Sequence, residues 1–217
     1  SAYGAPQVEA DASLNTNENP FSPSPELVKA IATRVTEIGS RLNRYPDREA
    51  TELRTSLANY INSQSDTSID ISNVWAANGS NEIIQSIFLA FGRKSALGFT
   101  PSYSMHSLIA KVTATPWIDG TRRKDFTLDC DAAAAQIESL RPTLTFITTP
   151  NNPTGSAVLI SEIEMLARSA ALVGGLLVID EAYAEFSSEK SFAISDLIEL
   201  YQQKQLLKSI RALHQFE

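Results

Sequence analysis

From Val74 onward, short apolar runs alternate with segments whose apolar residues recur at helical spacing. The runs at 74–77, 96–99, 144–148 and 176–179 have the length and content of buried strands. Strands that are covered on both faces are apolar throughout, and parallel strands need crossover connections, which are usually helices. The alternation therefore predicts an α/β fold, with a mainly parallel sheet flanked by helices.

The predicted helices carry recognisable start and stop signals. Ser24 followed by Pro25 predicts a helix start, and an apolar stripe continues to Ile38. A second helix is expected from about Glu49, and a short one from Ser107 to Val112. Residues 161–164 match a capping box, and the Gly174-Gly175 pair should end the helix that it opens. Ala132 to Ala135 fall in a further expected helix.

Composition narrows the classes of partner. The 217 residues are 43% hydrophobic, enough for one well-cored domain. A net charge of −7, without a Lys/Arg cluster, argues against a nucleic-acid or anionic-membrane surface and favours small molecules. Cys130 is the single cysteine, so we expect a buried thiol in a reducing compartment. No apolar run approaches the ~20 residues that span a bilayer, and no signal-peptide profile opens the chain. We therefore expect a cytoplasmic protein.

Residues 79–82, Gly-Ser-Asn-Glu, fall between an expected strand and an expected helix. Free backbone amides and the positive end of a helix dipole favour a phosphate at such a place. A plain glycine turn with a serine cap would leave the same pattern. Tyr103 follows the next strand, at the sheet edge where ligands of open α/β folds bind. Its ring could stack on a flat heteroaromatic group, or it could be an ordinary half-buried tyrosine.

Residues 151–155, Asn-Asn-Pro-Thr-Gly, form a restrained loop after a strand. Such a loop could aim an asparagine amide at a ligand, although a simple turn would use the same residue types. Asp180 ends another buried run, where a carboxylate needs a partner such as a protonated pyridine nitrogen. That pairing would keep the ring an electron sink. A metal or nucleotide-hydrolase acid is the alternative, but the sequence contains no G-x-x-x-x-G-K-[ST] loop.

These segments together resemble the histidinol-phosphate aminotransferase family. The resemblance runs in family order from residue 3 to about residue 186. The segments that carry it are LNTNENPF (14–21), RYPD (44–47), GSNE (79–82), PSYSM (101–105), NNPTG (151–155) and DEAYAEF (180–186). Their combination is far more specific than any one of them.

The resemblance implies the large domain of a fold type I aminotransferase that uses pyridoxal 5′-phosphate. It also implies a homodimer and amino transfer between histidinol phosphate and 2-oxoglutarate. An N-terminal arm with the first helix would occupy residues 1–40 and a partial cofactor-binding domain residues 41–217, and the family's small C-terminal domain would be absent. No nucleic-acid, membrane or metal partner is implied.

The resemblance also assigns roles to single residues. The cofactor-binding residues would be Ser80 and Asn81 at the phosphate, Tyr103 on the ring, Asn152 and Tyr183 at the ring oxygen, Asp180 at the ring nitrogen, and Tyr45 reaching the partner subunit's cofactor. The substrate-binding residues would be Tyr3, Asn17 and Asn19.

The pattern breaks at the Schiff-base lysine. The family places that lysine beyond the aspartate in a Ser-Lys-x-x-Gly-like setting, and its loss should abolish turnover. In this chain the alignment puts His214 at the serine and Gln215 at the lysine. Lys208 is a possible substitute, but it lies in a run that looks helical and lacks the glycine.

Three interpretations remain open at this stage. The chain could be a truncated histidinol-phosphate aminotransferase that is inactive by itself. It could be a non-catalytic binding or dimerisation module that keeps the phosphate cradle. It could also be related to threonine-phosphate decarboxylases, which share much of this motif set, although the Asn-rich opening favours the first interpretation.

Overall fold

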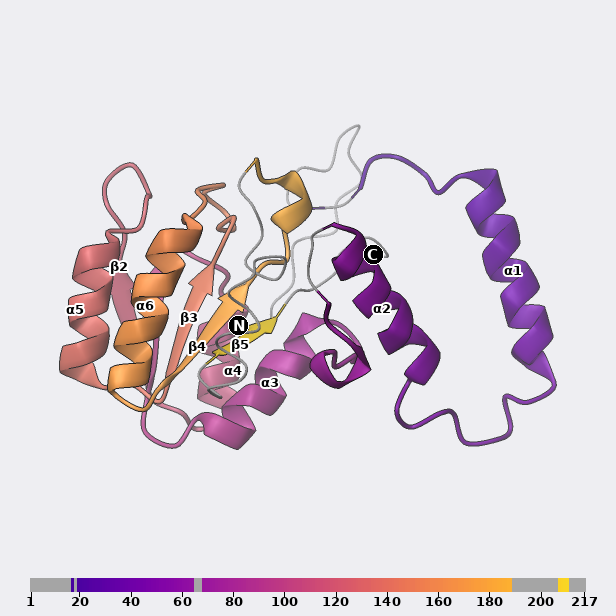
Figure 1. The fold of residues 1–217 in the computed structure, drawn as a ribbon, viewed down its shortest axis with the longest axis horizontal. Coiled ribbons are helices and arrows are strands. Elements are labelled where there is room, and N and C mark those ends of the chain that lie inside the picture. Colours follow the sequence, from indigo (N-terminus) through magenta and orange to yellow (C-terminus); the bar gives the residue numbers. More distant parts are fainter. Residues whose placement is uncertain (1–16, 18, 65–67, 189–206, 211–217) are drawn as a thin grey trace. The chain divides into compact units, whose positions relative to one another are not determined.

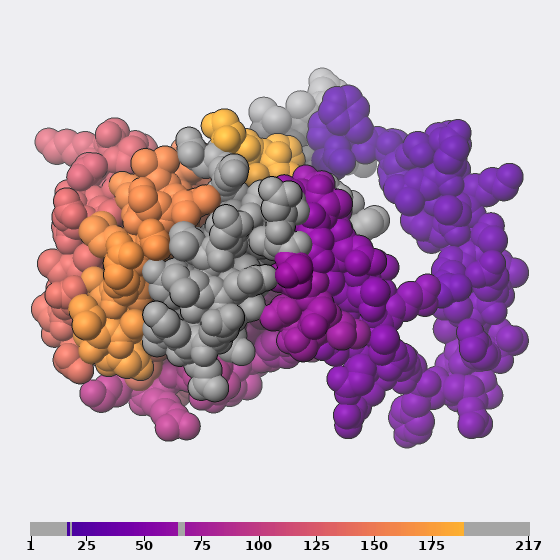
Figure 2. Space-filling view, in the orientation of Figure 1, coloured from indigo at the N-terminus to yellow at the C-terminus, as the bar shows by residue number. Residues whose placement is uncertain are grey.

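In the computed structural model, the described residues are 17, 19–64, 68–188 and 207–210, the last four by their backbone only. The chain divides into two compact units, Ser1–Glu49 with Gln215–Glu217, and Ala50–His214. Figure 1 labels the helices and most of the strands, and Figure 2 shows the same view with the atoms as spheres.

The first unit contributes one described helix, α1 (Pro25–Gly39). Its start confirms the sequence prediction, because Leu27 N donates to Ser24 Oγ at 3.2 Å and proline occupies the first turn. The apolar stripe forms as expected on this helix, but no α1 residue is buried. Leu27, Val28 and Ile31 expose 41–52% of their surface.

The second unit is built on a five-stranded parallel sheet of order β2-β1-β3-β4-β5. The strands are β1 (Ala96–Thr100), β2 (Trp117–Thr121), β3 (Leu144–Thr148), β4 (Leu176–Asp180) and β5 (Leu207–Ile210). The predicted α/β class with a parallel sheet is confirmed. β2 was not expected from sequence, because its residues Trp117–Thr121 include an aspartate and a glycine and form no apolar run.

Two layers of helices cover the sheet. They are α3 (Ser80–Phe91), α4 (Met105–Val112), α5 (Cys130–Leu140) and α6 (Ile160–Leu172). A further helix, α2 (Thr51–Ser63), forms a small separate core with Ile69 and Val74, and two short 3-10 turns are η1 (Ile71–Asn73) and η2 (Ala184–Phe186). α5 and α6 pack on the face that carries Leu97, Ile147 and Ile179. α3 and α4 pack on the face that carries Phe146 and Val178. Successive residues of a strand therefore pack alternately into two separate cores, which explains the continuous apolar runs.

Residues 74–77 correct one prediction, since they form no strand of the described sheet. Arg54 on α2 contacts the start of this run. Its Nε donates to Val74 O at 2.6 Å, and its Nη2 donates to Ile71 O at 2.7 Å. Part of the backbone hydrogen bonding at this place is thus satisfied by a side chain.

Two helix starts were placed too late. α6 begins at Ile160, and Glu162 serves as its third residue, whose carboxylate accepts from Leu159 N at 3.0 Å. Ser161 is therefore inside the first turn and is not the cap. The predicted end is correct, because Gly174 follows the helix with φ +71°. α4 begins at Met105, two residues before the expected start.

The prediction that Lys208 lies in a helical run is also wrong. The run that looked helical forms β5, in which Lys208 pairs with Val178 and Ile210 pairs with Asp180. The pairing with β4 supplies a backbone partner that local sequence cannot reveal.

The order of the strands creates a switch point. From β1 the chain crosses to β2 on one side, and the next strand, β3, lies on the other side of β1. In open α/β sheets the crevice for ligands lies at the carboxyl ends of the two strands where the direction of winding changes. β1 and β3 are those strands here.

Candidate functional site

The turn that begins α3 lies in the unit with the switch point. Gly79 has φ +80°, a conformation that favours glycine, and it is followed by Ser80 and Asn81 at the first two helical positions. Glu82 turns back to accept hydrogen bonds from Asn78 N at 2.8 Å and Asn78 Nδ2 at 3.0 Å. The start of the helix is thus held by its own side chains and presents its positive dipole end.

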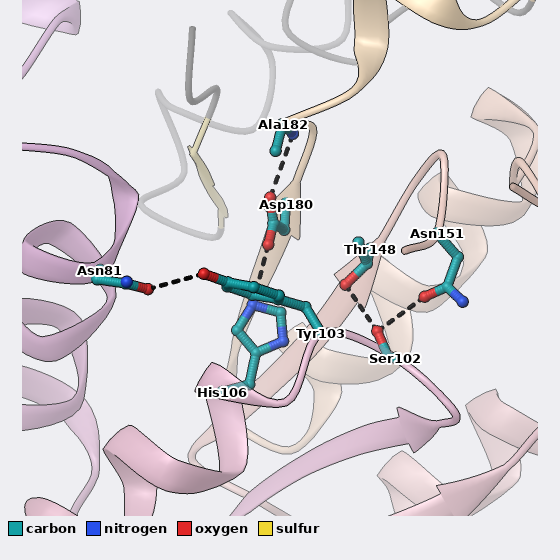
Figure 3. A network of polar contacts seen from close by, with 8 residues as sticks. All are labelled: Asn81, Ser102, Tyr103, His106, Thr148, Asn151, Asp180 and Ala182. Atoms are coloured by element: carbon teal, nitrogen blue, oxygen red, sulfur yellow. Dashed lines mark hydrogen bonds and ion pairs between the residues drawn. The ribbon is translucent and has the colours of Figure 1, made fainter. Parts of the chain in front are cut away.

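Tyr103 connects this turn to the sheet. It follows β1 and is half-buried, and its hydroxyl donates to Asn81 Oδ1 at 3.3 Å. The ring stands edge-on to the His106 ring, with centroids 5.5 Å apart and planes at 87° (Figure 3). The phenol is therefore held at both ends, by α3 and by α4.

Asp180 and His106 form a buried pair at the end of β4. His106 Nε2 lies 3.0 Å from Asp180 Oδ2, with 2% of His106 and 4% of Asp180 exposed. The other carboxylate oxygen, Oδ1, accepts from Ala182 N at 3.2 Å. Because a carboxylate only accepts, an ionised Asp180 requires the imidazole hydrogen on Nε2. The pair supplies Asp180 with the donor that a buried carboxylate needs.

His106 was not predicted from the sequence as a site residue. Residues 105 and 106 preceded the expected helix start, so the imidazole was not placed on a helix. A usable signal existed, because Asp180 shares its strand face with Val178, and that face is covered by α3 and α4. A polar residue on the buried side of either helix was the natural candidate for its partner.

The Asn151–Gly155 loop separates the roles of its two asparagines. Asn151 is 2% exposed and its amide makes three side-chain hydrogen bonds, to Ser102, Pro101 and Thr154. Asn152 is only half-buried. The amide of Asn151 is therefore used inside the protein.

The gathered groups have the chemistry to hold a flat, phosphate-bearing aromatic cation. A helix N-terminus suits the phosphate, a phenol ring offers a face for stacking, and a buried carboxylate suits a protonated ring nitrogen. Among the described residues, no group of three His, Cys, Asp or Glu side chains could hold a metal ion.

Residues 11–208 match the family model for aminotransferase class I and II. The chain belongs to this aminotransferase family. It is 51% identical over 201 residues to histidinol-phosphate aminotransferase of Thermobifida fusca, covering 92% of this chain and 53% of that protein. It is 52% identical over 193 residues to the enzyme of the same name from Rhodococcus opacus, covering 88% and 50%. The chain spans about half the length of these relatives.

Solved aminotransferase structures share the fold. Histidinol-phosphate aminotransferase from Sinorhizobium meliloti, in complex with pyridoxal 5′-phosphate, aligns with a TM-score of 0.71 at 20% identity over 90% of this chain and 50% of that one. The enzyme from Clostridium acetobutylicum aligns with a TM-score of 0.69 at 23% identity over 87% and 52%. These likenesses confirm the fold type I aminotransferase architecture.

The predicted site residues of this aminotransferase chain fall into three groups. Ser80, Asn81, Tyr103, Asn152, Asp180 and Tyr183 all belong to the second unit. Asn17, Asn19 and Tyr45 belong to the first unit and are exposed. Tyr3 and Gln215, together with His214, lie outside the described residues.

Within the second unit, Asn81, Tyr103 and Asp180 share the cluster of polar contacts in Figure 3. Tyr183 lies just beyond Asp180, half-buried, with its ring centroid 6.4 Å from that of Phe186. Lys208, paired with Val178, lies two residues before the end of the sheet at Asp180.

Cys130 takes no part in this site. It is buried at the start of α5, and burial, reinforced by the nearby Glu162 carboxylate, raises the pKa of its thiol to about 12. Burial likewise lowers the pKa of Arg122, which donates to Phe99 O at 3.2 Å. In the described part of the chain, no helix is both long and apolar enough to cross a membrane.

Proposed function

We propose that this chain holds pyridoxal 5′-phosphate at the carboxyl edge of its sheet. The observation that carries the proposal is the position of Tyr103, which contacts the start of α3 through Asn81 and the Asp180 pair through His106. Tyr103 thereby connects the helix start that suits a phosphate with the carboxylate that suits a ring nitrogen, and its own ring offers the stacking surface. The relative from Sinorhizobium meliloti was solved with the same cofactor.

The proposal gives each of these residues the role that the resemblance implies. Ser80 and Asn81 bind the phosphate, Tyr103 stacks on the ring, and Asn152 and Tyr183 bind the ring oxygen. Asp180 binds the ring nitrogen and keeps it protonated, while His106 orients Asp180. When bound, the cofactor supplies an electron sink for reactions at the α-carbon of an amine.

The substrates proposed for the whole aminotransferase are L-histidinol phosphate and 2-oxoglutarate, with glutamate on the other side of the exchange. Curated relatives at about half identity bear the name histidinol-phosphate aminotransferase, which supports this reaction over a threonine-phosphate decarboxylase. Tyr3, Asn17 and Asn19 are proposed to contact the substrate. Such a biosynthetic role fits a cytoplasmic enzyme.

We infer that the 217-residue chain does not catalyse this exchange alone. Lys208 is paired within the sheet, and Gln215 occupies the position aligned with the lysine. Gln215 has no amine that could hold the cofactor covalently and carry the proton. The second candidate function is therefore a non-catalytic binding or dimerisation module, and Gln215 at the aligned lysine position supports it.

A homodimer is proposed as the assembly. The exposed apolar stripe of α1 supports it, since four of its residues expose 41–54% of their surface. Tyr45, which is fully exposed, is proposed to reach the cofactor phosphate of the second copy. Sedimentation across a range of concentrations tests this assembly, and a chain that stays monomeric would contradict it.

Cofactor titration tests the proposed function. Pyridoxal 5′-phosphate should bind the purified chain, and Asp180→Asn should weaken binding at least about tenfold, the loss expected for a charged partner. Asp131→Asn, an exposed acid in the first turn of α5, is the matched control and should leave binding unchanged. Borohydride reduction should label no lysine stoichiometrically. A single label on Lys208 would contradict the proposed inactivity, and absence of binding would contradict the cofactor.

A further inference from the structure

The backbone ladder between β1 and β3 is short. β1 pairs with β2 over all five of its residues, and β3 pairs with β4 over all five of its own. Among the described residues, pairing between β1 and β3 stops after Ala96 with Leu144 and Leu97 with Thr145. The carboxyl halves of the two strands at the switch point are therefore not joined by main-chain pairing.

Side-chain hydrogen bonds connect the carboxyl ends of β1 and β3, where main-chain pairing has stopped. Ser102, in the loop after β1, has its Oγ 2.7 Å from Asn151 Oδ1 and 3.0 Å from Thr148 Oγ1 (Figure 3). Asn151 Nδ2 donates back to Pro101 O at 3.0 Å. Three hydrogen bonds thus cross from the loop after β1 to the end of β3 and its loop.

The chemistry of the amide fixes its orientation. Its nitrogen faces the Pro101 carbonyl and Thr154 Oγ1, the latter at 2.8 Å, so both of its hydrogens are used. Turning the amide over would place its oxygen against the Pro101 carbonyl. Asn151 Oδ1 must therefore accept from Ser102, and the Thr148 hydroxyl satisfies its own contact by donating to Ser102 Oγ.

Asn151 is not available to a ligand, and Ser102 has no hydrogen left to donate to one. Asn151 is 2% exposed, and both of its amide hydrogens are used inside the protein. Ser102 spends its only hydrogen on Asn151. Their sequence neighbours, Tyr103 and Asn152, are both half-buried and stand next to the two linked residues.

We propose that Ser102 and Asn151 form a link that sets the spacing between Tyr103 and Asn152. Ser102 and Asn151 are positioning residues. This proposal rests on the proposed function, because the cofactor ring would lie between Tyr103 and Asn152. The link replaces main-chain pairing at the carboxyl ends of the two strands and so holds the two loops together.

Comparison of two probes tests the link. Ser102→Ala should weaken binding of pyridoxal 5′-phosphate about tenfold, the effect of losing about one net hydrogen bond. Binding of inorganic phosphate, which needs only the start of α3, should change less than about twofold. Ser102→Thr keeps the hydroxyl and should restore the affinity for pyridoxal 5′-phosphate to within about threefold.

Ser104→Ala is the matched control, because Ser104 is an exposed serine in the same loop and its side chain does not cap α4. It should leave both affinities unchanged. Equal weakening of both probes by Ser102→Ala would mean a general structural role, and an effect no larger than that of Ser104→Ala would overturn the proposal.

Hydrogen exchange tests the link without any cofactor. The amides of Asn151 and Gly155 are bonded within the loop, to Ser156 O at 2.8 Å and Asn151 O at 2.7 Å. Ser102→Ala should speed exchange at both about tenfold, while an α6 amide such as that of Ile163 keeps its rate. If wild-type chain fails to bind pyridoxal 5′-phosphate, the proposed function falls. The link is then judged by these amides, and unchanged exchange would refute it.

Discussion

His106 Nε2 lies 3.0 Å from Asp180 Oδ2, and the two residues come from different layers of the fold. Asp180 ends β4, whereas His106 lies in the first turn of α4, 74 positions earlier in the chain. The His106 ring also packs against Phe146, with centroids 4.8 Å apart. The Asp180 carboxylate is thus oriented by His106, whose ring is itself fixed by packing in the core.

Replacement of His106 by leucine should destabilise the chain. Asp180 Oδ2 would lose its partner inside the protein, which costs about 1–3 kcal/mol of the free energy of unfolding. Urea denaturation measures this loss. Ile109→Val, on the same helix and also buried, should cost only about 0.5–1.5 kcal/mol and should spare cofactor binding. A His106→Leu variant that bound pyridoxal 5′-phosphate as well as the wild type would contradict the orienting role.

Gly79→Ala should weaken phosphate binding. Gly79 has φ +80°, so alanine there is strained by about 1 kcal/mol or more, and the turn before Ser80 should change shape. Gly174→Ala is a matched control, with φ +71°, equally open surroundings and a place before β4 at the other end of the sheet. Both variants should lose stability in thermal unfolding, but only Gly79→Ala should bind inorganic phosphate less tightly. Equal affinities in the two variants would argue against a phosphate site at α3.

Gly98→Ala should destabilise the sheet. A Cβ at Gly98 would clash with the Trp117 ring, which packs among Phe88, His106 and Phe146. Overpacking of this kind costs about 1–3 kcal/mol of unfolding free energy. Gly39→Ala, where nothing lies within 4 Å, is the control and should not lower the midpoint of chemical unfolding. If both variants unfold at the wild-type midpoint, the packing of Trp117 over β1 is wrong.

Cys130 should resist alkylation in the folded chain. Its thiol is buried and its pKa is raised to about 12, so the reactive thiolate is scarce at pH 8. Iodoacetamide labelling followed by mass spectrometry should be slow in buffer and fast in denaturant. The labelling rate should also rise with pH up to about 12 while the fold persists. Rapid labelling of native chain at pH 8 would contradict the burial.

Asp129 should make the thermal stability of the chain depend on pH in the acidic range. Its carboxylate accepts from Ala132 N at 3.1 Å at the start of α5, and that bond, with help from Arg123, lowers its pKa. Since the lowered pKa belongs to the folded state, the stabilisation is present above the unfolded value and is lost as pH falls through the folded one. The difference in thermal midpoint between wild type and Asp129→Ala should therefore shrink from pH 7 to pH 2. A difference that stays constant over that range would contradict the charged cap.

Local patterns were enough for several features of this protein. The apolar runs at 96–99, 144–148 and 176–179 predicted three strands, because complete burial leaves a continuous signal in sequence. Ser24 and Pro25 predicted the start of α1, because a cap depends on neighbours within one turn. The aminotransferase family, too, could be recognised from the order of its motifs.

Features that depend on distant partners could not be predicted in this way. The run at 74–77 has the composition of a strand, but it joins no strand of the described sheet, and its first carbonyl accepts from Arg54 on α2. Lys208 sits in a strand only because β4 pairs with it. Propensity is a weak guide wherever a tertiary contact competes for the same backbone group.

Residue types alone identified the groups that the site can use, namely a glycine turn, a phenol, two asparagines and a carboxylate. Which side chains act together depends on packing, since His106 reaches Asp180 across 74 positions and Ser102 reaches Asn151 across 49. Hydrogen bonds need contact distances, and contacts between residues so far apart in the chain exist only after the sheet and its helices have packed.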